Sequence, residues 1–372
     1  MSLPIRPNVL RMAPYSPGKP IEDVQRELGL EQVVKLASNE NPFGPSPRAI
    51  EAMQKAAATS HLYPDAAATD LVERLAELHD VPKNQIALGN GSDNLIQVIG
   101  HVMLGSATDC VVVGSPSFVR YGSIAQLAGC RLTEVPATSE WALDAQAMAA
   151  AANSETRLAF LANPNNPTGS YTSATNASLL VEAVRDSGLA VFDEAYYEFA
   201  CDQPDYPPSI EWVRQGRPVA VLRTFSKAYG LAGVRLGYLV GPAELVDAVN
   251  RAREPFNVNR IAQAAALAAL DDPGHVARTV EGTQRSLATI VDACRTMRVP
   301  CLPTWANFVC IEVGGDDVRV AQDLQARGVI VRPGSVLGMP GFLRVSAGTP
   351  EETSAFLEAL APVLAERMEP SR

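Results

Sequence analysis

The chain lacks the features that mark membrane proteins and nucleic-acid-binding proteins. No apolar run approaches the ~20 residues needed to cross a bilayer, and residues 1–7 have no apolar stretch of the kind found in a signal peptide. The formal net charge is −10 and basic residues form no block, so we expect neither a nucleic acid nor an anionic membrane surface as a partner.

Cysteine and histidine are also sparse. The six cysteines have no CxxC spacing and the four histidines are scattered, so neither set predicts a metal site or a disulfide framework. A reducing cytoplasm is the expected location. The 372 residues are 47% hydrophobic and 19% charged, which favours a globular chain with one large domain and a smaller one attached.

The organisation of the chain changes along its length. Residues 1–35 are predicted to form an irregular arm, because the proline-rich stretch at 14–20 cannot be regular helix. From about residue 65, amphipathic helices alternate with short apolar strands, expected at 86–88, 110–113, 157–161, 189–192, 219–222 and 236–240. Strands that are apolar throughout must be covered on both faces, which predicts an α/β fold with a mostly parallel sheet.

The C-terminal third has a different pattern, with a long helix at 276–298 and a last helix from about 350. Between them we expect strands at 308–313, 329–331 and 343–345 and a helix near 317–327. This pattern predicts a smaller α/β domain. We therefore expect an N-terminal arm over 1–35, a large domain over 36–254 whose first residues pack with the small one, and a small domain over 255–372.

Lys227 has the most informative surroundings in the chain. It follows the apolar strand at 219–222, the hydroxyls of Thr224 and Ser226 precede it, and Arg235 comes eight residues later. A lysine in this setting can form a Schiff base beside a bound phosphate, which suits pyridoxal phosphate (PLP). A lone lysine after a strand would be a surface residue, but three further motifs accompany this one.

Other polar residues follow the carboxyl ends of neighbouring strands, the edge where ligands bind in open α/β sheets. Asp193 could keep the pyridine nitrogen of PLP protonated, and Asn166 and Tyr196 could donate to the phenolate oxygen of its ring. The structural alternatives are a turn or helix-capping aspartate at Asp193 and a packed tyrosine at Tyr196.

The cofactor phosphate needs donors. The backbone amides of Gly91, Ser92 and Asp93 open a predicted helix, and a helix N-terminus favours anions. The hydroxyls and the arginine near Lys227 add donors and a positive charge. The glycine loop is not GxGxxG, which disfavours a dinucleotide. Phe118 could stack on the ring or belong to the core.

Two arginines of the C-terminal third are candidate anion ligands. Arg344 lies on a predicted strand, where its guanidinium could bind a carboxylate bidentately or form an internal salt bridge. Arg332 could bind a second anionic group.

With these residues in place, the chain resembles the histidinol-phosphate aminotransferases, fold-type I PLP enzymes of aminotransferase class I/II, nearly from end to end. The asparagine-proline run at 163–169 and the lysine block at 224–238 are the specific motifs. Further similar segments are 14–20, 38–47, 63–65, 89–93, 193–196, 306–308 and 343–349.

The resemblance implies a seven-stranded sheet and a homodimer with shared active sites. Lys227 would hold PLP and move a proton at the substrate, assisted by Asp193 and Tyr196. Tyr63 would reach the cofactor phosphate of the other subunit. Arg344 would bind the glutamate carboxylate. The remaining substrate-binding residues implied are Tyr15, Asn41 and Arg332.

The implied reaction converts histidinol phosphate and 2-oxoglutarate to imidazole acetol phosphate and glutamate, in histidine biosynthesis. Alternatives are an aromatic or other 2-oxo-acid aminotransferase of the same family, a PLP decarboxylase of a phosphorylated amino acid, a Rossmann-like oxidoreductase, or a non-catalytic binding protein. The sequence departs from the family pattern at Asn94, at 116–118 and at 334–337. The resemblance places the last segment where the substrate binds, so the sequence does not determine which amino donor the protein uses.

Overall fold

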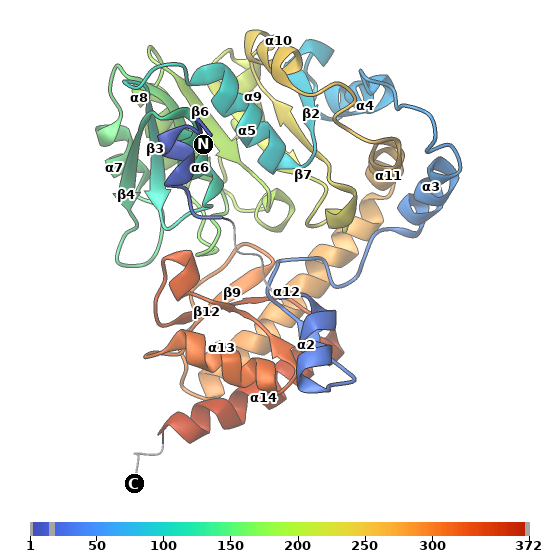
Figure 1. Cartoon of the computed structure of the whole chain (residues 1–372), viewed down its shortest axis with the longest axis vertical. Coiled ribbons are helices and arrows are strands. Elements are labelled where there is room, and N and C mark those ends of the chain that lie inside the picture. The colour runs from blue at the N-terminus through green and yellow to red at the C-terminus, as the bar shows by residue number, and fades with distance from the viewer. Residues whose placement is uncertain (1–2, 15–18, 369–372) are drawn as a thin grey trace.

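The computed structural model describes residues 3–14 and 19–368, which form a larger and a smaller lobe (Figure 1). The larger lobe contains a seven-stranded sheet of order β2-β8-β7-β6-β5-β3-β4. Its strands are β2 (Ile86–Gly89), β3 (Cys110–Ser115), β4 (Arg131–Pro136), β5 (Thr156–Ala162), β6 (Leu189–Asp193), β7 (Val219–Thr224) and β8 (Gly237–Val240). Only β8 runs antiparallel to its neighbours, which confirms the predicted α/β fold and its mostly parallel sheet.

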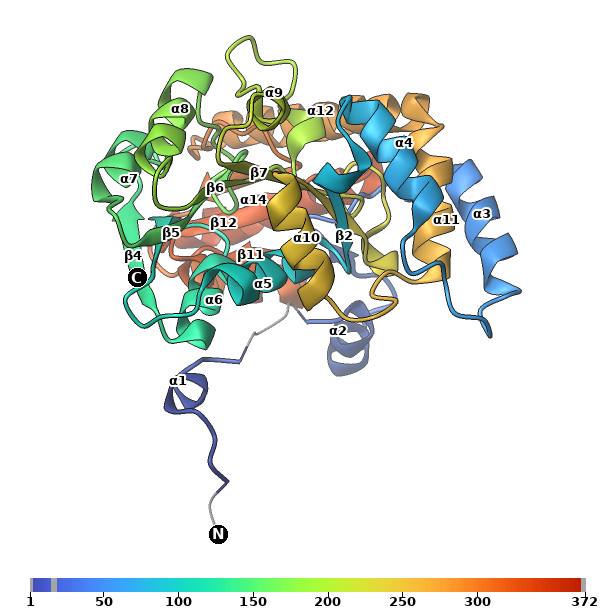
Figure 2. The same ribbon diagram turned by 90° about the horizontal axis from the view of Figure 1, so that it is seen from above.

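The sheet is covered on both faces because its strands are apolar on both faces. On β6, Ala190 and Phe192 belong to one buried cluster, and Leu189 and Val191 belong to the other. One cluster is completed by α5 (Ser92–Met103), α6 (Arg120–Ala128) and α10 (Ala243–Ala252). The other is completed by α4 (Thr69–His79), α7 (Ala145–Ala151), α8 (Ala174–Ala183), α9 (Ser209–Arg214) and α11 (Arg260–Leu270), and Figure 2 shows the two helical layers on either side of the strands.

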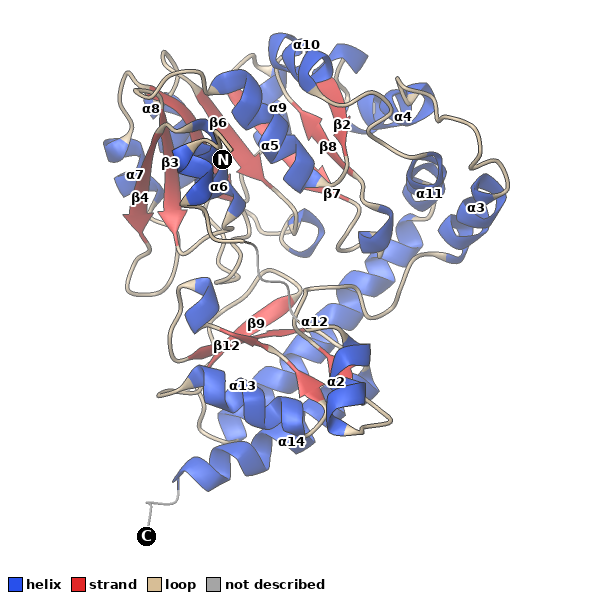
Figure 3. Cartoon of the chain, viewed as in Figure 1, coloured by secondary structure: helices blue, strands red, loops and turns tan. Residues whose placement is uncertain are grey.

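The smaller lobe has its own core. It contains the antiparallel sheet β11-β12-β9, formed by β9 (Phe308–Glu312), β11 (Arg332–Pro333) and β12 (Phe342–Ser346), and the parallel pair β1 (Val34–Lys35) and β10 (Val329–Ile330). The helices α13 (Asp317–Ala326) and α14 (Pro350–Met368) pack there, and the long helix α12 (Pro273–Thr296) runs from one lobe to the other (Figure 3). No helix within residues 3–14 and 19–368 has the length and apolar character to span a bilayer.

The first 35 residues are not uniformly irregular, so this expectation is wrong for part of the segment. They contain α1 (Pro7–Leu10) and α2 (Ile21–Leu28). The helix α2 begins directly after Pro20, has acidic residues in its first turn and ends at Gly29 in the left-handed conformation. Its Val24 is buried against Ala37 and Ile330, so tertiary packing stabilises the helix. The proline-rich stretch ends just before the helix and does not interrupt it.

The proposed domain division at residue 254 stays a prediction. Helix α11, which follows this position, packs against α3 (Pro47–Ala57) in the core of the larger lobe. The edge strand β4 was not among the expected strands, because most of its residues are exposed or half-buried and its sequence lacks a continuous apolar run.

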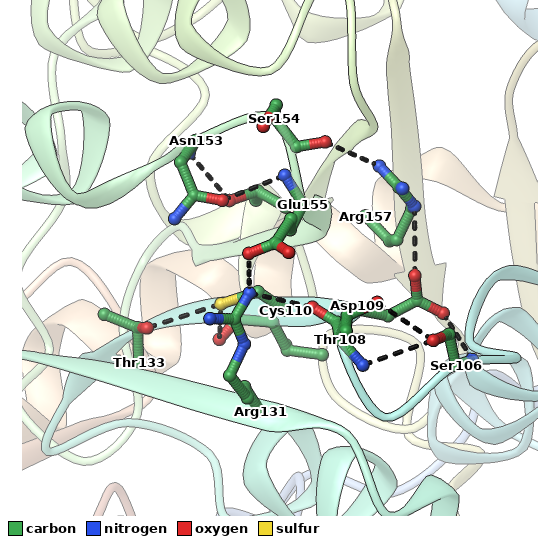
Figure 4. Close-up of polar contacts among 12 residues, drawn as sticks. Ser106, Thr108, Asp109, Cys110, Arg131, Thr133, Asn153, Ser154, Glu155 and Arg157 are labelled. Carbon is green, nitrogen blue, oxygen red and sulfur yellow. Dashed lines mark hydrogen bonds and ion pairs between the residues drawn. The ribbon is translucent and has the colours of Figure 1, made fainter.

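Polar contacts fix the amino ends of β3, β4 and β5 at one edge of the sheet (Figure 4). The carboxylate of Asp109 accepts hydrogen bonds from the amides of Gly105 and Ser106 at 2.8 Å and pairs with Arg157 at 3.2 Å. Arg131, on β4, pairs with Glu155, just before β5. These contacts lie at the strand ends opposite to those that carry the candidate site residues.

Candidate active site

A cavity of about 900 Å³ lies between the two lobes, at the carboxyl ends of the parallel strands. The segments after β3, β5, β6 and β7 contribute Phe118, Asn166, Tyr196 and Lys227 to its wall. The smaller lobe contributes Arg332 and Arg344, together with the residues that follow Arg332. The parallel topology therefore brings together side chains that are far apart in sequence, as predicted.

Lys227 is held by backbone carbonyls. Its Nζ donates to Asn39 O at 3.1 Å and to Ser38 O at 3.4 Å, and it lies 5.7 Å from the centre of the Tyr196 ring. Burial lowers the pKa of this amine to about 8, and the charge of Arg344 acts in the same direction. A lysine with a lowered pKa is neutral more often near pH 7, which makes it a better nucleophile toward a carbonyl carbon.

Asp193 is a buried carboxylate at the last position of β6. It accepts hydrogen bonds from the Tyr121 hydroxyl at 2.8 Å and from the Ala195 amide at 3.2 Å. Burial raises its pKa to about 6, although the hydrogen bond from Tyr121 opposes this shift. The site thus holds a carboxylate whose charge is stabilised by neutral donors and which would gain from a cationic partner.

Tyr121 was not predicted from the sequence. It lies on α6, where its ring stacks on Phe160 with 4.6 Å between centroids and meets the edge of Phe118 at 5.7 Å. The only signal was a tyrosine three residues after Phe118 on an apolar helix face, which is also typical of ordinary core packing.

Asn166 and Arg344 come from different lobes and meet in the cavity. Arg344 Nη1 donates to Asn166 Oδ1 at 2.6 Å, and Nη2 donates to Ala37 O at 2.8 Å. The guanidinium carbon of Arg344 also lies 5.3 Å from the centre of the Phe308 ring. This arginine is therefore buried and oriented, as a specific anion ligand must be.

Tyr196 has a defined hydrogen-bond partner. Its hydroxyl accepts from Asn39 Nδ2 at 2.9 Å, which leaves the hydroxyl proton available to donate elsewhere. Asn39 is itself held by Ser346, whose Oγ donates to Asn39 Oδ1 at 3.0 Å and accepts from the Asn39 amide at 2.9 Å. Sequence reasoning placed Asn39 in a motif but gave it no role in the site.

The predicted phosphate donors converge at the start of α5. A Cβ atom on Gly91 would lie 2.5 Å from Arg235 Nη2, so the guanidinium lies directly against this glycine. A Cβ on Gly237 would lie 2.5 Å from the Ser92 nitrogen, so β8 approaches the same helix end equally closely. Both contacts need glycine, and they bring a positive charge to a helix N-terminus.

Thr224 pairs with Gly237 in the ladder of β7 and β8, which brings it close to this helix end. Its Oγ1 donates to Ser226 Oγ at 3.0 Å and accepts from the Ser226 amide at 3.1 Å. The carboxylate of Asp93 accepts a hydrogen bond from Arg120 Nε at 2.5 Å, and the positive guanidinium compensates its negative charge. Asp93 can therefore contribute its backbone amide to an anion site although its side chain is acidic.

Several predicted residues do not line the cavity: these are Asp193, which hydrogen-bonds to the lining residue Tyr121, and Gly91, Ser92, Asp93, Thr224, Ser226 and Arg235. Tyr63 and Asn41 do not line it either. Tyr63 is 78% exposed and stacks on Phe256 with 4.5 Å between centroids. The side-chain Nδ2 of Asn41 donates to Ala228 O at 3.1 Å, and its Oδ1 accepts from the Phe43 amide. This side chain therefore contacts the backbone of the residue that follows Lys227. Tyr15 lies outside the described residues. The roles predicted for these three residues, like those of the other site residues, stay predictions.

Comparison with known proteins agrees with this geometry. Residues 31–360 match the model of the aminotransferase class I and II family, and the chain belongs to this family. Within it, the chain is similar to histidinol-phosphate aminotransferases: it is 43% identical to that of Akkermansia muciniphila, over 96% of this chain and 98% of the relative. It is 45% identical to that of Symbiobacterium thermophilum, over 97% of this chain and 99% of the relative.

The fold agrees as well. The crystal structure of histidinol-phosphate aminotransferase from Sinorhizobium meliloti in complex with pyridoxal-5'-phosphate matches with a TM-score of 0.88 at 29% identity, covering 99% of each chain. The predicted family and fold are therefore confirmed.

Proposed function

We propose that the protein is a PLP-dependent aminotransferase that converts histidinol phosphate and 2-oxoglutarate to imidazole acetol phosphate and glutamate, as in histidine biosynthesis. The observation that carries the proposal is one cavity lined by Lys227, Arg344 and Tyr121, in which Tyr121 donates a hydrogen bond to the buried Asp193 behind it. The chain that contains them is 45% identical to a histidinol-phosphate aminotransferase over nearly its whole length.

The residues present fit PLP. Asp193 is buried, and the hydrogen bonds that it accepts within residues 3–14 and 19–368 come from neutral groups, so the protonated ring nitrogen of PLP would supply the missing positive charge. Arg235 and the amides that open α5 offer the phosphate a positive charge and N–H donors. The glycine at position 91 leaves room beside the arginine for this close approach.

Bound PLP would withdraw electrons from the substrate α-carbon. Lys227 would hold the cofactor and then, as a free amine, take the proton from the substrate α-carbon and deliver it to the C4′ carbon of the cofactor. Asp193 would keep the proton on the ring nitrogen. The Tyr196 hydroxyl, which accepts from Asn39, would donate its own proton to the ring oxygen together with Asn166.

Two arginines would bind the anionic groups of the substrates. Arg332 and Arg344 are paired neighbours in the antiparallel ladder of β11 and β12, and both line the cavity. Glutamate and 2-oxoglutarate each present two carboxylates, whereas histidinol phosphate presents a phosphate and no carboxylate. We assign Arg344 to the carboxylate and Arg332 to the phosphate, with Tyr15 and Asn41 as further substrate residues.

We also propose that the active unit is a homodimer in which Tyr63 serves the cofactor phosphate of the other subunit. Tyr63, Phe256 and Leu62 are exposed apolar residues, and the first two stack on each other. Exposed apolar groups of this kind mark surfaces that other proteins cover.

All six cysteines of the chain are free thiols, which is consistent with the proposed reducing cytoplasm.

The absorbance spectrum of the PLP-loaded protein tests the proposal. We expect a visible band that is lost on addition of glutamate and, in a separate sample, on addition of histidinol phosphate. Loss with glutamate alone would keep the aminotransferase and direct the search for the donor to aromatic amino acids. Release of carbon dioxide without a 2-oxo acid would indicate a decarboxylase, and no visible band would overturn the role of Lys227.

A further inference from the structure

The cavity wall on the side of the smaller lobe is formed by a short loop after β11. This loop, residues 334–341, is here called the wall loop; it contains one 3-10 turn, Ser335–Leu337. Val336, Leu337 and Gly338 line the cavity beside Arg332, and Val336 is 56% exposed. The loop thus presents apolar side chains next to a positive charge.

The wall loop also meets the larger lobe. A Cβ atom on Gly338, which has a φ of +79°, would lie 3.2 Å from Cβ of Pro116 in the turn after β3. Small displacements of the loop would therefore change both the width of the cavity and the contact between the lobes.

One buried carboxylate holds both ends of the wall loop. Asp317, the first residue of α13, is 2% exposed. Its Oδ2 accepts from the Ser335 amide at 2.8 Å, and its Oδ1 accepts from the Ser335 hydroxyl and from the Gly341 amide, the latter at 3.2 Å. Burial alone would raise the pKa of Asp317, but these hydrogen bonds outweigh it and lower the pKa, so the carboxylate is charged at neutral pH.

We propose that Asp317 is a positioning residue that sets donor selectivity by fixing the wall loop. Asp317 does not line the cavity, so it acts through Val336 and Leu337 and through the neighbouring Arg332. The inference rests on the proposed function, since it assigns the wall loop to the side where the phosphorylated donor binds. An amino donor that carries both an anionic group and a ring would contact Arg332 and the apolar side chains of the wall loop at the same time.

The test compares Asp317→Ala and Asp317→Asn with Asp272→Ala. Asp272 is a matched control, because it also caps a helix, accepting from the His275 amide at 3.3 Å at the start of α12, and the wall loop has no part in that contact. Hydrogen exchange of the wall-loop amides is measured first, on the PLP-loaded protein without substrate. We expect faster exchange at 334–341 in both Asp317 variants and not in the Asp272 variant.

The second measurement is the concentration of each donor that half-bleaches the visible band. We expect Asp317→Ala to raise this concentration for histidinol phosphate roughly tenfold, and to change it for glutamate no more than about twofold, with PLP occupancy unchanged. Ser335→Ala, which removes one of the three contacts, should give a smaller effect of the same kind and keeps the test decisive if Asp317→Ala folds poorly.

The outcomes separate the two proposals. If the unsubstituted protein does not respond to histidinol phosphate, the proposed donor is wrong; the exchange data and the glutamate-to-phenylalanine preference of the Asp317 variants then decide the role of Asp317. Unchanged exchange at 334–341, or faster exchange with an unchanged donor preference, would overturn the positioning role. An equal loss for every donor together with lost PLP would show a structural residue and would also overturn it.

Discussion

Arg223 and Glu194 form a buried ion pair directly behind the strand ends that carry the candidate site. Arg223 Nη2 lies 2.8 Å from Glu194 Oε2, and their side chains are 8% and 0% exposed. The guanidinium carbon also lies 3.4 Å from the centre of the Tyr197 ring. Since Glu194 follows Asp193 and Arg223 precedes Thr224, the pair ties together the two segments that supply a carboxylate and a hydroxyl to the site.

Breaking this pair is expected to destabilise the fold strongly. Glu194→Gln keeps the size of the side chain but leaves the Arg223 guanidinium buried without its countercharge. We expect a loss of about 3–5 kcal/mol in the free energy of unfolding, measured by urea denaturation. The control is Asp247→Asn, which removes the exposed partner of Arg251 and should cost less than ~1 kcal/mol. Equal losses in the two variants would contradict the assignment.

Tyr121→Phe is expected to change the pH dependence of PLP binding. The pKa of Asp193 is raised to about 6 by burial, and the hydrogen bond from Tyr121 holds it down, so removal of the hydroxyl raises it further. A protonated Asp193 cannot stabilise a cationic ring nitrogen. Affinity for PLP should therefore fall as the pH drops toward 6, and in Tyr121→Phe this fall should begin at higher pH.

The measurement is an equilibrium titration with PLP between pH 5 and pH 8. Tyr171→Phe is the matched control, because it also removes a tyrosine-to-aspartate hydrogen bond, to Asp205 at 2.6 Å, away from the cavity. Identical pH profiles for the two variants would show that Tyr121 does not tune Asp193.

His79 should make the fold less stable in mild acid. Burial lowers the pKa of His79 to about 3, with the charges of Arg223 and Arg214 acting in the same direction, and its Nε2 lies 3.0 Å from the Tyr238 hydroxyl. The unfolded chain binds a proton below about pH 6.5 that the folded chain does not bind until about pH 3. Stability is therefore lost as the pH falls from 6.5, by about 2 kcal/mol at pH 5.

His79→Gln should remove this part of the pH dependence, measured as the free energy of unfolding at pH 7.5 and pH 5. His61→Gln, at an exposed position, is the control and should keep the slope of the unsubstituted protein. The raised pKa of Asp193 gives an opposite slope between about pH 4 and 6, but both variants share it and the comparison cancels it. An unchanged slope in His79→Gln would refute the buried neutral imidazole.

Lys227→Ala should lose both the visible absorbance with PLP and all turnover. The amine is the group that would bond to the cofactor and move the substrate proton, so no neighbouring residue replaces it. Lys83→Ala, which removes an exposed lysine paired with Glu73, should keep both properties. Full activity in Lys227→Ala would end the PLP interpretation.

Mixed dimers test whether the active sites are shared. Tyr63→Phe and Lys227→Ala chains, each impaired alone, should regain activity when they are unfolded together and refolded. In a mixed dimer, one site would combine Lys227 of one chain with Tyr63 of the other, so random pairing should restore about a quarter of full activity. Activity that never exceeds the mean of the two separate variants would contradict a shared site.

The sequence predicted the strands around the candidate site because those strands depend on local signals. The apolar runs before Asn166, Asp193 and Lys227 form the adjacent strands β5, β6 and β7. Parallel order then places the residues that follow them at one edge, whatever the details of the loops.

What could not be predicted are contacts between distant segments. Asn39 and Tyr196 are 157 positions apart, and Tyr121 and Asp193 are 72 positions apart, so no periodicity links them. The helix α2 depends on burial of Val24 by a segment some 300 residues later, and β4 is an edge strand without a continuous apolar run. Each exception is a case in which tertiary packing overrides local propensity.

The contacts at the amino ends of β3, β4 and β5 separate the stability of the sheet from the proposed chemistry. Asp109, Arg157 and Arg131 hold the strands at the ends remote from the cavity, so we expect substitutions there to change the stability of the fold and not the reaction. At the other ends, the Arg223–Glu194 pair stands directly beside the proposed site, so a substitution can change both. Engineering for greater stability would therefore begin at the amino ends.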